Sequence, residues 1–173
     1  MKQKITITNV LPNICVGHVR LTAAKVVRNA VRAAQLLAAM EAIAFVESDR
    51  DKILDLALLH ISKRGKLRRL VDDIRAWHSA DPSDWRQTFT HIENKYGYDK
   101  FGGGCHVIPN HAIIQMAFLH GDDDFQRTLM IAATAGWDTD CNVGNVGALM
   151  GIKNGLDGID RGPDFRTPVA DRM

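Results

Sequence analysis

Two aspartates one residue apart carry the strongest chemical signal in this 173-residue sequence. Asp138 and Asp140 follow Gly136 and stand at the start of a long stretch of small and apolar residues. Carboxylate oxygens are the ligands that hard divalent cations prefer, and a helix N-terminus can order the loop that carries them. The pair therefore predicts half of a metal site.

Three glycines follow this pair where a helix is expected, at positions 144, 147 and 151. Each interior glycine costs a helix about 1 kcal/mol relative to alanine, so a packing reason is expected for them. Together with Ala148 they share one helical face. We therefore expect another backbone to approach closely behind the metal ligands.

An EF-hand calcium loop is the first alternative for this segment. Asp138, Asp140 and Asn142 occupy its first, third and fifth ligand positions. Its sixth position should be glycine and is Val143, and its twelfth should be glutamate and is Leu149. The sequence therefore argues against an EF-hand.

A simple helix start is the second alternative. Asp138 or Thr139 would then cap the free backbone amides of the first turn, and no ion would be bound. The residues alone leave capping and metal binding both open.

The elements that must position the aspartates are predicted to be helices. Apolar residues recur at helical spacing, and Ser, Asp and Gly mark the ends of the segments. The predicted helices cover residues 22–46, 51–61, 66–78 and 85–95, a segment from Pro109 to Gly121, a segment from 122–124 to Gly136, and the segment after the aspartates, with a loop-rich tail from Gly155. The fold class is thus all-α, a multi-helix bundle, with a short strand predicted at residues 4–10.

The first predicted helix lacks Pro and Gly after residue 22, and its apolar residues predict a core position. The stripe expected to be buried consists of Val27, Val31, Ala34, Leu37, Ala38 and Ala44.

Length and composition limit the class of protein. A chain of 173 residues with 46% hydrophobic and 24% charged residues is typical of one globular domain. The net charge of +2 is too small to predict a nucleic-acid surface, and the basic run at residues 63–69 is interpreted as the solvated start of a helix. We therefore expect no nucleic-acid partner.

Cysteine use and hydropathy indicate a compartment. Cys15, Cys105 and Cys141 form no Cys-x-x-Cys pair, which favours a reducing cytoplasm over a disulfide framework. No signal-peptide core and no run of ~18 apolar residues is present, so export and membrane insertion are not expected.

Cys105, His106, His111 and Cys141 could also be imagined as a zinc site or a Cys-His nucleophilic pair. Their spacing matches no standard zinc pattern. The triple glycine at residues 102–104 could admit a phosphate against bare backbone, although a flexible connector is the favoured interpretation.

The segment Gly-Trp-Asp-Thr-Asp-Cys-Asn and the small-residue helix after it resemble the C-terminal metal motif of the ADP-ribosylglycohydrolases. Further matching pieces follow the order of that family: Tyr96-Gly97-Tyr98, His106-Val107-Ile108-Pro109-Asn110-His111-Ala112 and the closing Pro168-Val169-Ala170-Asp171-Arg172. The resemblance covers residues 22–173 as one helical domain, and residues 1–21 form an extension outside it.

The resemblance implies an all-helical hydrolase with a two-magnesium centre, or manganese in its place, that cleaves the bond between ADP-ribose and an acceptor. It places Asp138 and Asp140 among the metal ligands, with Cys141 where a threonine hydroxyl is common. The implied substrate-binding residues are Tyr98, Gly103, His106 and Asn110. The implied ligands are ADP-ribose and ADP-ribosylated proteins.

Two acidic elements of the family are missing from this sequence, a glycine-rich one and a Thr-Asp-Asp one. They would supply further metal ligands and the catalytic base, so no catalytic residue is assigned. We expect the chain to be the C-terminal portion of such an enzyme, with weak metal binding and poor turnover by itself. The alternatives are a non-catalytic helical module that binds a nucleotide or a protein, and a homo-oligomer in which two chains share elements, with the strand from Ile5 to Val10 as the contact.

Overall fold

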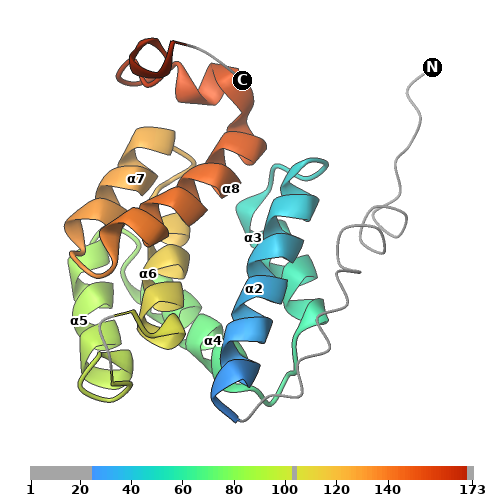
Figure 1. Ribbon diagram of the computed structural model, residues 1–173, viewed down its shortest axis with the longest axis vertical. Helices are drawn as coiled ribbons and strands as arrows, with labels where there is room; N and C mark the ends of the chain where they lie inside the picture. The colour runs from blue at the N-terminus through green and yellow to red at the C-terminus, as the bar shows by residue number, and fades with distance from the viewer. Residues whose placement is uncertain (1–24, 103–104, 171–173) are drawn as a thin grey trace.

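The computed structural model describes residues 25–102 and 105–170 (Figure 1). These residues form seven α-helices and two short 3-10 helices, and no strand occurs among them. In chain order the elements are α2 (Lys25–Ala44), α3 (Arg50–Ala57), η1 (Leu58–His60), α4 (Lys66–Ala80), α5 (Trp85–Tyr96), α6 (Val107–His120), α7 (Phe125–Thr134), α8 (Thr139–Ile159) and η2 (Thr167–Val169). The all-α prediction is confirmed, whereas the strand predicted at residues 4–10 lies outside the described residues.

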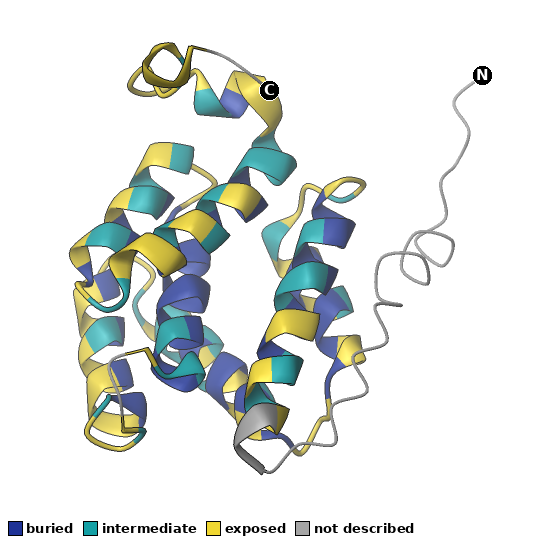
Figure 2. Cartoon of the chain, viewed as in Figure 1, coloured by how far each residue is buried: buried dark blue, intermediate teal, exposed yellow. Residues whose placement is uncertain are grey.

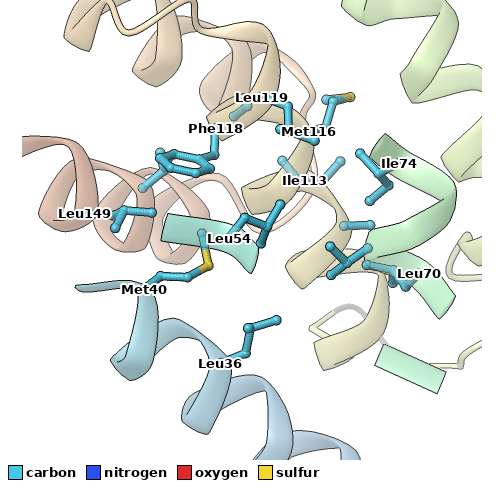
Figure 3. Packing of buried hydrophobic residues seen from close by; sticks show 14 of the residues in the cluster. Leu36, Met40, Leu54, Leu70, Ile74, Ile113, Met116, Phe118, Leu119 and Leu149 are labelled. Carbon is cyan, nitrogen blue, oxygen red and sulfur yellow. The ribbon is translucent and has the colours of Figure 1, made fainter. Parts of the chain in front are cut away.

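The central helix of the bundle is α6. Figure 1 shows it with α2 and α3 to one side and α5 and α7 to the other, and it packs against α2, α4, α5, α7 and α8. Every residue from His111 to His120 is buried, which gives α6 its dark colour in Figure 2. A helix that is apolar on all sides requires neighbours on all sides. Its Ile113, Met116 and Phe118 lie in the main core (Figure 3).

Aspartates begin three of the helices. Asp49, Asp84 and Asp124 are the N-cap residues of α3, α5 and α7, and each carboxylate accepts a hydrogen bond from a backbone N–H of the first turn. Such a cap satisfies an amide that has no partner within the helix. These polar caps explain why the predicted starts of these helices lie close to the observed ones.

Three predicted boundaries are wrong. The second helix is predicted to end at residue 61, but α3 ends at Ala57 and the 3-10 helix η1 follows it. The helix α6 begins at Val107 rather than after Pro109, so that Pro109 lies in its first turn. Backbone N–H groups of the first turn have no partner within the helix, and a proline there therefore costs no hydrogen bond. The last helix continues past Gly155 to Ile159, across a break at which Gly155 has φ 64° and ψ −171°. Glycine adopts this backbone conformation without the clash that a Cβ would cause.

The buried face of α2 also differs from the predicted stripe. Ala34 is exposed and Leu37 is only half-buried, whereas Ala33, Leu36 and Met40 are buried. The helix carries apolar residues around most of its circumference. Its packing against α3, α6 and α8 therefore decides which of them enter the core.

No described helix is both long enough and apolar enough to cross a lipid bilayer.

Candidate metal centre

The turn between α7 and α8 holds the predicted metal ligands in an unusual backbone conformation. Gly136 has φ 79°, and Asp138 has φ 44° and ψ 53°, which is the left-handed region. Asp is among the few residues with a Cβ that enter this region, and such conformations gather at functional sites. The α-helix then starts at Thr139.

A buried amide holds this turn. Asn142 is 1% exposed, and its Nδ2 donates to the carbonyl oxygen of Trp137 at 2.6 Å. Its Oδ1 is buried and has no hydrogen-bond partner among the described residues. Asn142 therefore ties the first turn of α8 to the residue before Asp138.

Asp138 stands at the N-cap position of α8 but does not cap the helix. Its carboxylate instead accepts a hydrogen bond from Nδ2 of Asn110 on α6, and Oδ1 of Asn110 accepts one from the hydroxyl of Tyr98. The Tyr98 ring also lies 5.0 Å from that of Trp137. The capping interpretation of Asp138 is thus wrong, and a side chain of α6 contacts its carboxylate.

Three potential ligand atoms converge at this turn. One ligand atom each of Asp138, Asp140 and Cys141 lie within 4.8 Å of one another, with Asp138 half-buried and the other two exposed. Within residues 25–102 and 105–170, no other group of three or more His, Cys, Asp or Glu residues lies close enough together to hold a metal ion. The structure therefore brings together the residues that the sequence singled out as metal ligands.

The chemistry of the three groups favours a hard cation held by oxygen. A hydrogen bond to Asp138 and the charges of Asp138 and Asp140 raise the pKa of the Cys141 thiol. Thiol sulfur is also a soft donor, which suits Mg²⁺ poorly. The two carboxylates fit Mg²⁺ or Mn²⁺, and Cys141 fits better as a hydrogen-bonding neighbour of Asp138.

A cavity of about 310 Å³ opens beside the turn, between α2, α6 and α8. Asn110, His111 and Cys141 line it together with alanines of α2. Cys105 also lines it. The predicted substrate residue Asn110 therefore joins the candidate ligands to an open volume.

The remaining predicted substrate residues are placed differently. Tyr98 is half-buried, and burial followed by the charge of Asp138 raises the pKa of its hydroxyl. His106 is the N-cap of α6, where its Nδ1 accepts from the N–H of Ile108 at 3.1 Å, and it does not line the cavity. Gly103 lies outside the described residues. The zinc alternative finds no support, because no zinc-like Cys and His cluster forms among the described residues.

The glycines of α8 do not admit another backbone as predicted. Gly144 has open space where a Cβ would stand, and Gly147 faces a side-chain carbon of Leu129 on α7. Of these two, only Gly147 is tightly packed, because a Cβ there would lie 3.2 Å from that Leu129 carbon. The structure shows no close backbone approach behind the candidate ligands.

Sequence reasoning missed Asn142 as the residue that holds the turn. In the sequence, Asn142 is only a polar residue four positions after Asp138, at the fifth ligand position of an EF-hand loop. The contact that matters joins its side chain to a backbone carbonyl, and residue types do not reveal such a bond.

We predict that Asn142→Ala loosens the turn. Loss of one buried hydrogen bond costs about 1 kcal/mol, so the amides of residues 137–142 should exchange with solvent roughly fivefold faster. Hydrogen–deuterium exchange measured by mass spectrometry would show this. Asn145→Ala is the matched control, because its Nδ2 donates to the Cys141 carbonyl one turn later. Equal exchange in the two variants would contradict the role of Asn142.

The family to which these features belong follows from comparison with known proteins. The model of the ADP-ribosylglycohydrolase family matches residues 20–172. Searches of curated proteins and of solved structures returned no match. The family match spans nearly the whole sequence, including α6, the left-handed turn and α8. The chain that places Asp138, Asp140 and Cys141 together is therefore a member of the ADP-ribosylglycohydrolase family.

Proposed function

We propose that the turn before α8 binds Mg²⁺, or Mn²⁺, and that the chain serves hydrolysis of the glycosidic bond between ADP-ribose and an acceptor. The observation that carries the proposal is the convergence of Asp138 and Asp140 within 4.8 Å, beside a cavity of about 310 Å³. Family membership supports the substrate class.

Each residue of the site has a proposed role. Asp138 and Asp140 hold the cation through oxygen, and Asn110 orients Asp138 through its amide hydrogen bond. Tyr98 keeps its proton near neutral pH, because its pKa is raised, and so continues to donate to Asn110. A bound divalent cation supplies charge stabilisation and can orient sugar hydroxyls or water at the reacting carbon.

Among the described residues, no carboxylate that could serve as a general base lines the cavity beside the turn. The Thr-Asp-Asp element of the family is also absent from the sequence. We therefore propose that this chain alone binds metal weakly and turns over slowly, and that additional acidic residues complete the two-ion centre. A non-catalytic module that binds ADP-ribose is the alternative.

Calorimetry with Mn²⁺, in the absence and presence of ADP-ribose, tests the centre. The wild-type chain should bind both, with each strengthening the other, and Asp140→Asn should weaken metal binding about tenfold or more because a charged ligand is lost. Asp157→Asn is the control, since Asp157 is an exposed acid on the same helix, distant from the turn. Equal metal binding by the wild type and Asp140→Asn would refute the proposal.

Release of ADP-ribose from a modified arginine or serine peptide tests the need for further residues. With Mg²⁺ and micromolar chain, little release is expected. Rapid release that disappears in Asp138→Asn would support the hydrolase and show that no further acidic element is needed. ADP-ribose binding that ignores metal would favour the non-catalytic module.

A further inference from the structure

A second cavity, of about 460 Å³, lies between α4, α5 and the loop that follows α5. Small-molecule sites commonly have volumes of about 300–1,000 Å³. None of the residues that line it also lines the cavity at the candidate metal centre. We call it the α4–α5 cavity.

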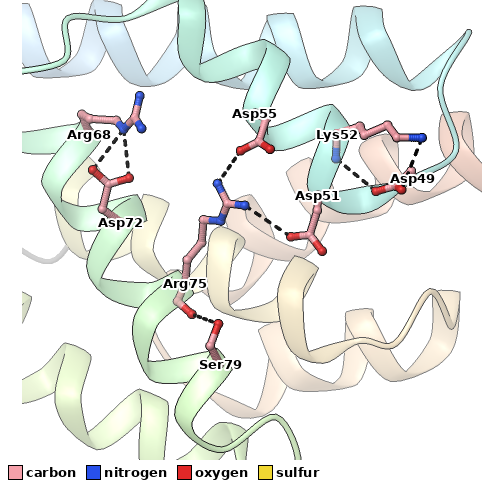
Figure 4. Close-up of polar contacts among 8 residues, drawn as sticks. All are labelled: Asp49, Asp51, Lys52, Asp55, Arg68, Asp72, Arg75 and Ser79. Atoms are coloured by element: carbon pink, nitrogen blue, oxygen red, sulfur yellow. Dashed lines mark hydrogen bonds and ion pairs between the residues drawn. The ribbon is translucent and has the colours of Figure 1, made fainter.

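The acids in the wall of the α4–α5 cavity already have partners. Asp72 accepts hydrogen bonds from Nε of Arg68 at 2.9 and 3.0 Å, as Figure 4 shows. Asp73 pairs with Nζ of Lys95 at 2.6 Å and accepts a hydrogen bond from the hydroxyl of Tyr96. Their negative charge is therefore largely neutralised within the protein.

Two cations in the same wall are not matched in this way. Lys66 and Arg69 are exposed, and neither forms an ion pair with a carboxylate in the described part of the chain. They lie one turn apart at the start of α4, whose first turn contains no acid. The cavity thus has a surplus of positive charge at this end.

Two aromatic rings also line the cavity. Phe101 and Tyr96 are stacked with ring centroids 6.4 Å apart, and Nζ of Lys66 lies 5.6 Å from the Phe101 ring centroid. The contact with Phe101 holds the Lys66 ammonium at the cavity. An arginine and a lysine in the wall of one cavity can together bind phosphate oxygens, since guanidinium binds them in a bidentate manner.

We propose that the α4–α5 cavity is a phosphate-binding site, in which Lys66 and Arg69 bind a phosphate or pyrophosphate group of a small-molecule ligand. The site is independent of the metal centre. Lys66 and Arg69 belong to the basic run at residues 63–69, which the sequence predicts to be a solvated helix start. The proposal gives these two cations a specific role.

Calorimetry with inorganic pyrophosphate in metal-free buffer tests the site, because no metal is then present to bridge the ligand to Asp138 or Asp140. The full chain should show saturable binding of one pyrophosphate. Lys66→Gln and Arg69→Gln should each weaken it about tenfold or more, through loss of a charged donor. Both side chains are exposed, so both variants should fold, which circular dichroism would verify.

Two controls separate this site from its rivals. Arg64→Gln removes an exposed cation of the same basic run that does not line the cavity, and should change the affinity less than twofold. Asp138→Asn should also leave it unchanged. The proposal is overturned by an absence of saturable binding, by equal losses in Arg64→Gln and Arg69→Gln, or by loss of binding in Asp138→Asn.

Discussion

Lowering the pH from 7 to 4 should destabilise the fold by about 3 kcal/mol through His111 alone. His111 lies in α6 and is 3% exposed, and burial lowers its pKa to about 4. In the unfolded chain its pKa is about 6.5. Between these values the unfolded chain binds a proton that the folded chain does not. The contribution of the neutral His111 to the free energy of unfolding is therefore fully present above about pH 6.5, and it is lost as the pH falls to about 4.

The neutral ring of His111 is also held by a neighbour. Nε2 of Gln115 lies 3.0 Å from Nε2 of His111, where an amide donor requires an unprotonated ring nitrogen. Protonation of this nitrogen would place two donors face to face. The hydrogen bond and the burial thus act in the same direction.

Urea unfolding at several pH values would measure the effect. His111→Gln removes the titrating ring, so the free energy of unfolding should fall by about 3 kcal/mol less than in the wild type between pH 7 and pH 4. His60→Gln, at an exposed histidine, should leave it unchanged. Burial also lowers the pKa of His78 and His120, so some loss of stability in acid should remain. Parallel curves for wild type and His111→Gln would show that His111 titrates freely in the fold.

Phe118→Ala should cost about 3–5 kcal/mol of unfolding free energy. The side chain is 1% exposed and is among the largest fully buried side chains, and it lies in the helix that packs against five others (Figure 3). Truncation removes buried apolar surface and leaves a cavity that fixed neighbours on several helices cannot fill. For a chain of this size, the melting temperature should fall by roughly 6–20 °C.

Differential scanning calorimetry would measure this loss. Leu59→Ala is the comparison, because Leu59 is 69% exposed and its truncation should change stability by less than about 0.5 kcal/mol. A cost below about 1 kcal/mol for Phe118→Ala would mean that α6 is not the rigid centre of the bundle.

The sequence by itself determined the fold class, most helix ends and the family. Helical periodicity and caps such as Asp84 and Asp124 are local signals, since a helix start needs only its own first turn. The Asp-Thr-Asp element identified the family and the two carboxylates, because spacing within one turn settles which side chains stand near one another.

Only the tertiary structure decided how these parts meet. Three features depend on contacts between different elements. They are the buried face of α2, the hydrogen bonds that link Tyr98, Asn110 and Asp138, and the α4–α5 cavity. An apolar residue favours burial against any partner, because the hydrophobic effect has no direction. A hydrogen bond instead requires two groups at one distance and angle, and packing of the whole chain decides whether they meet.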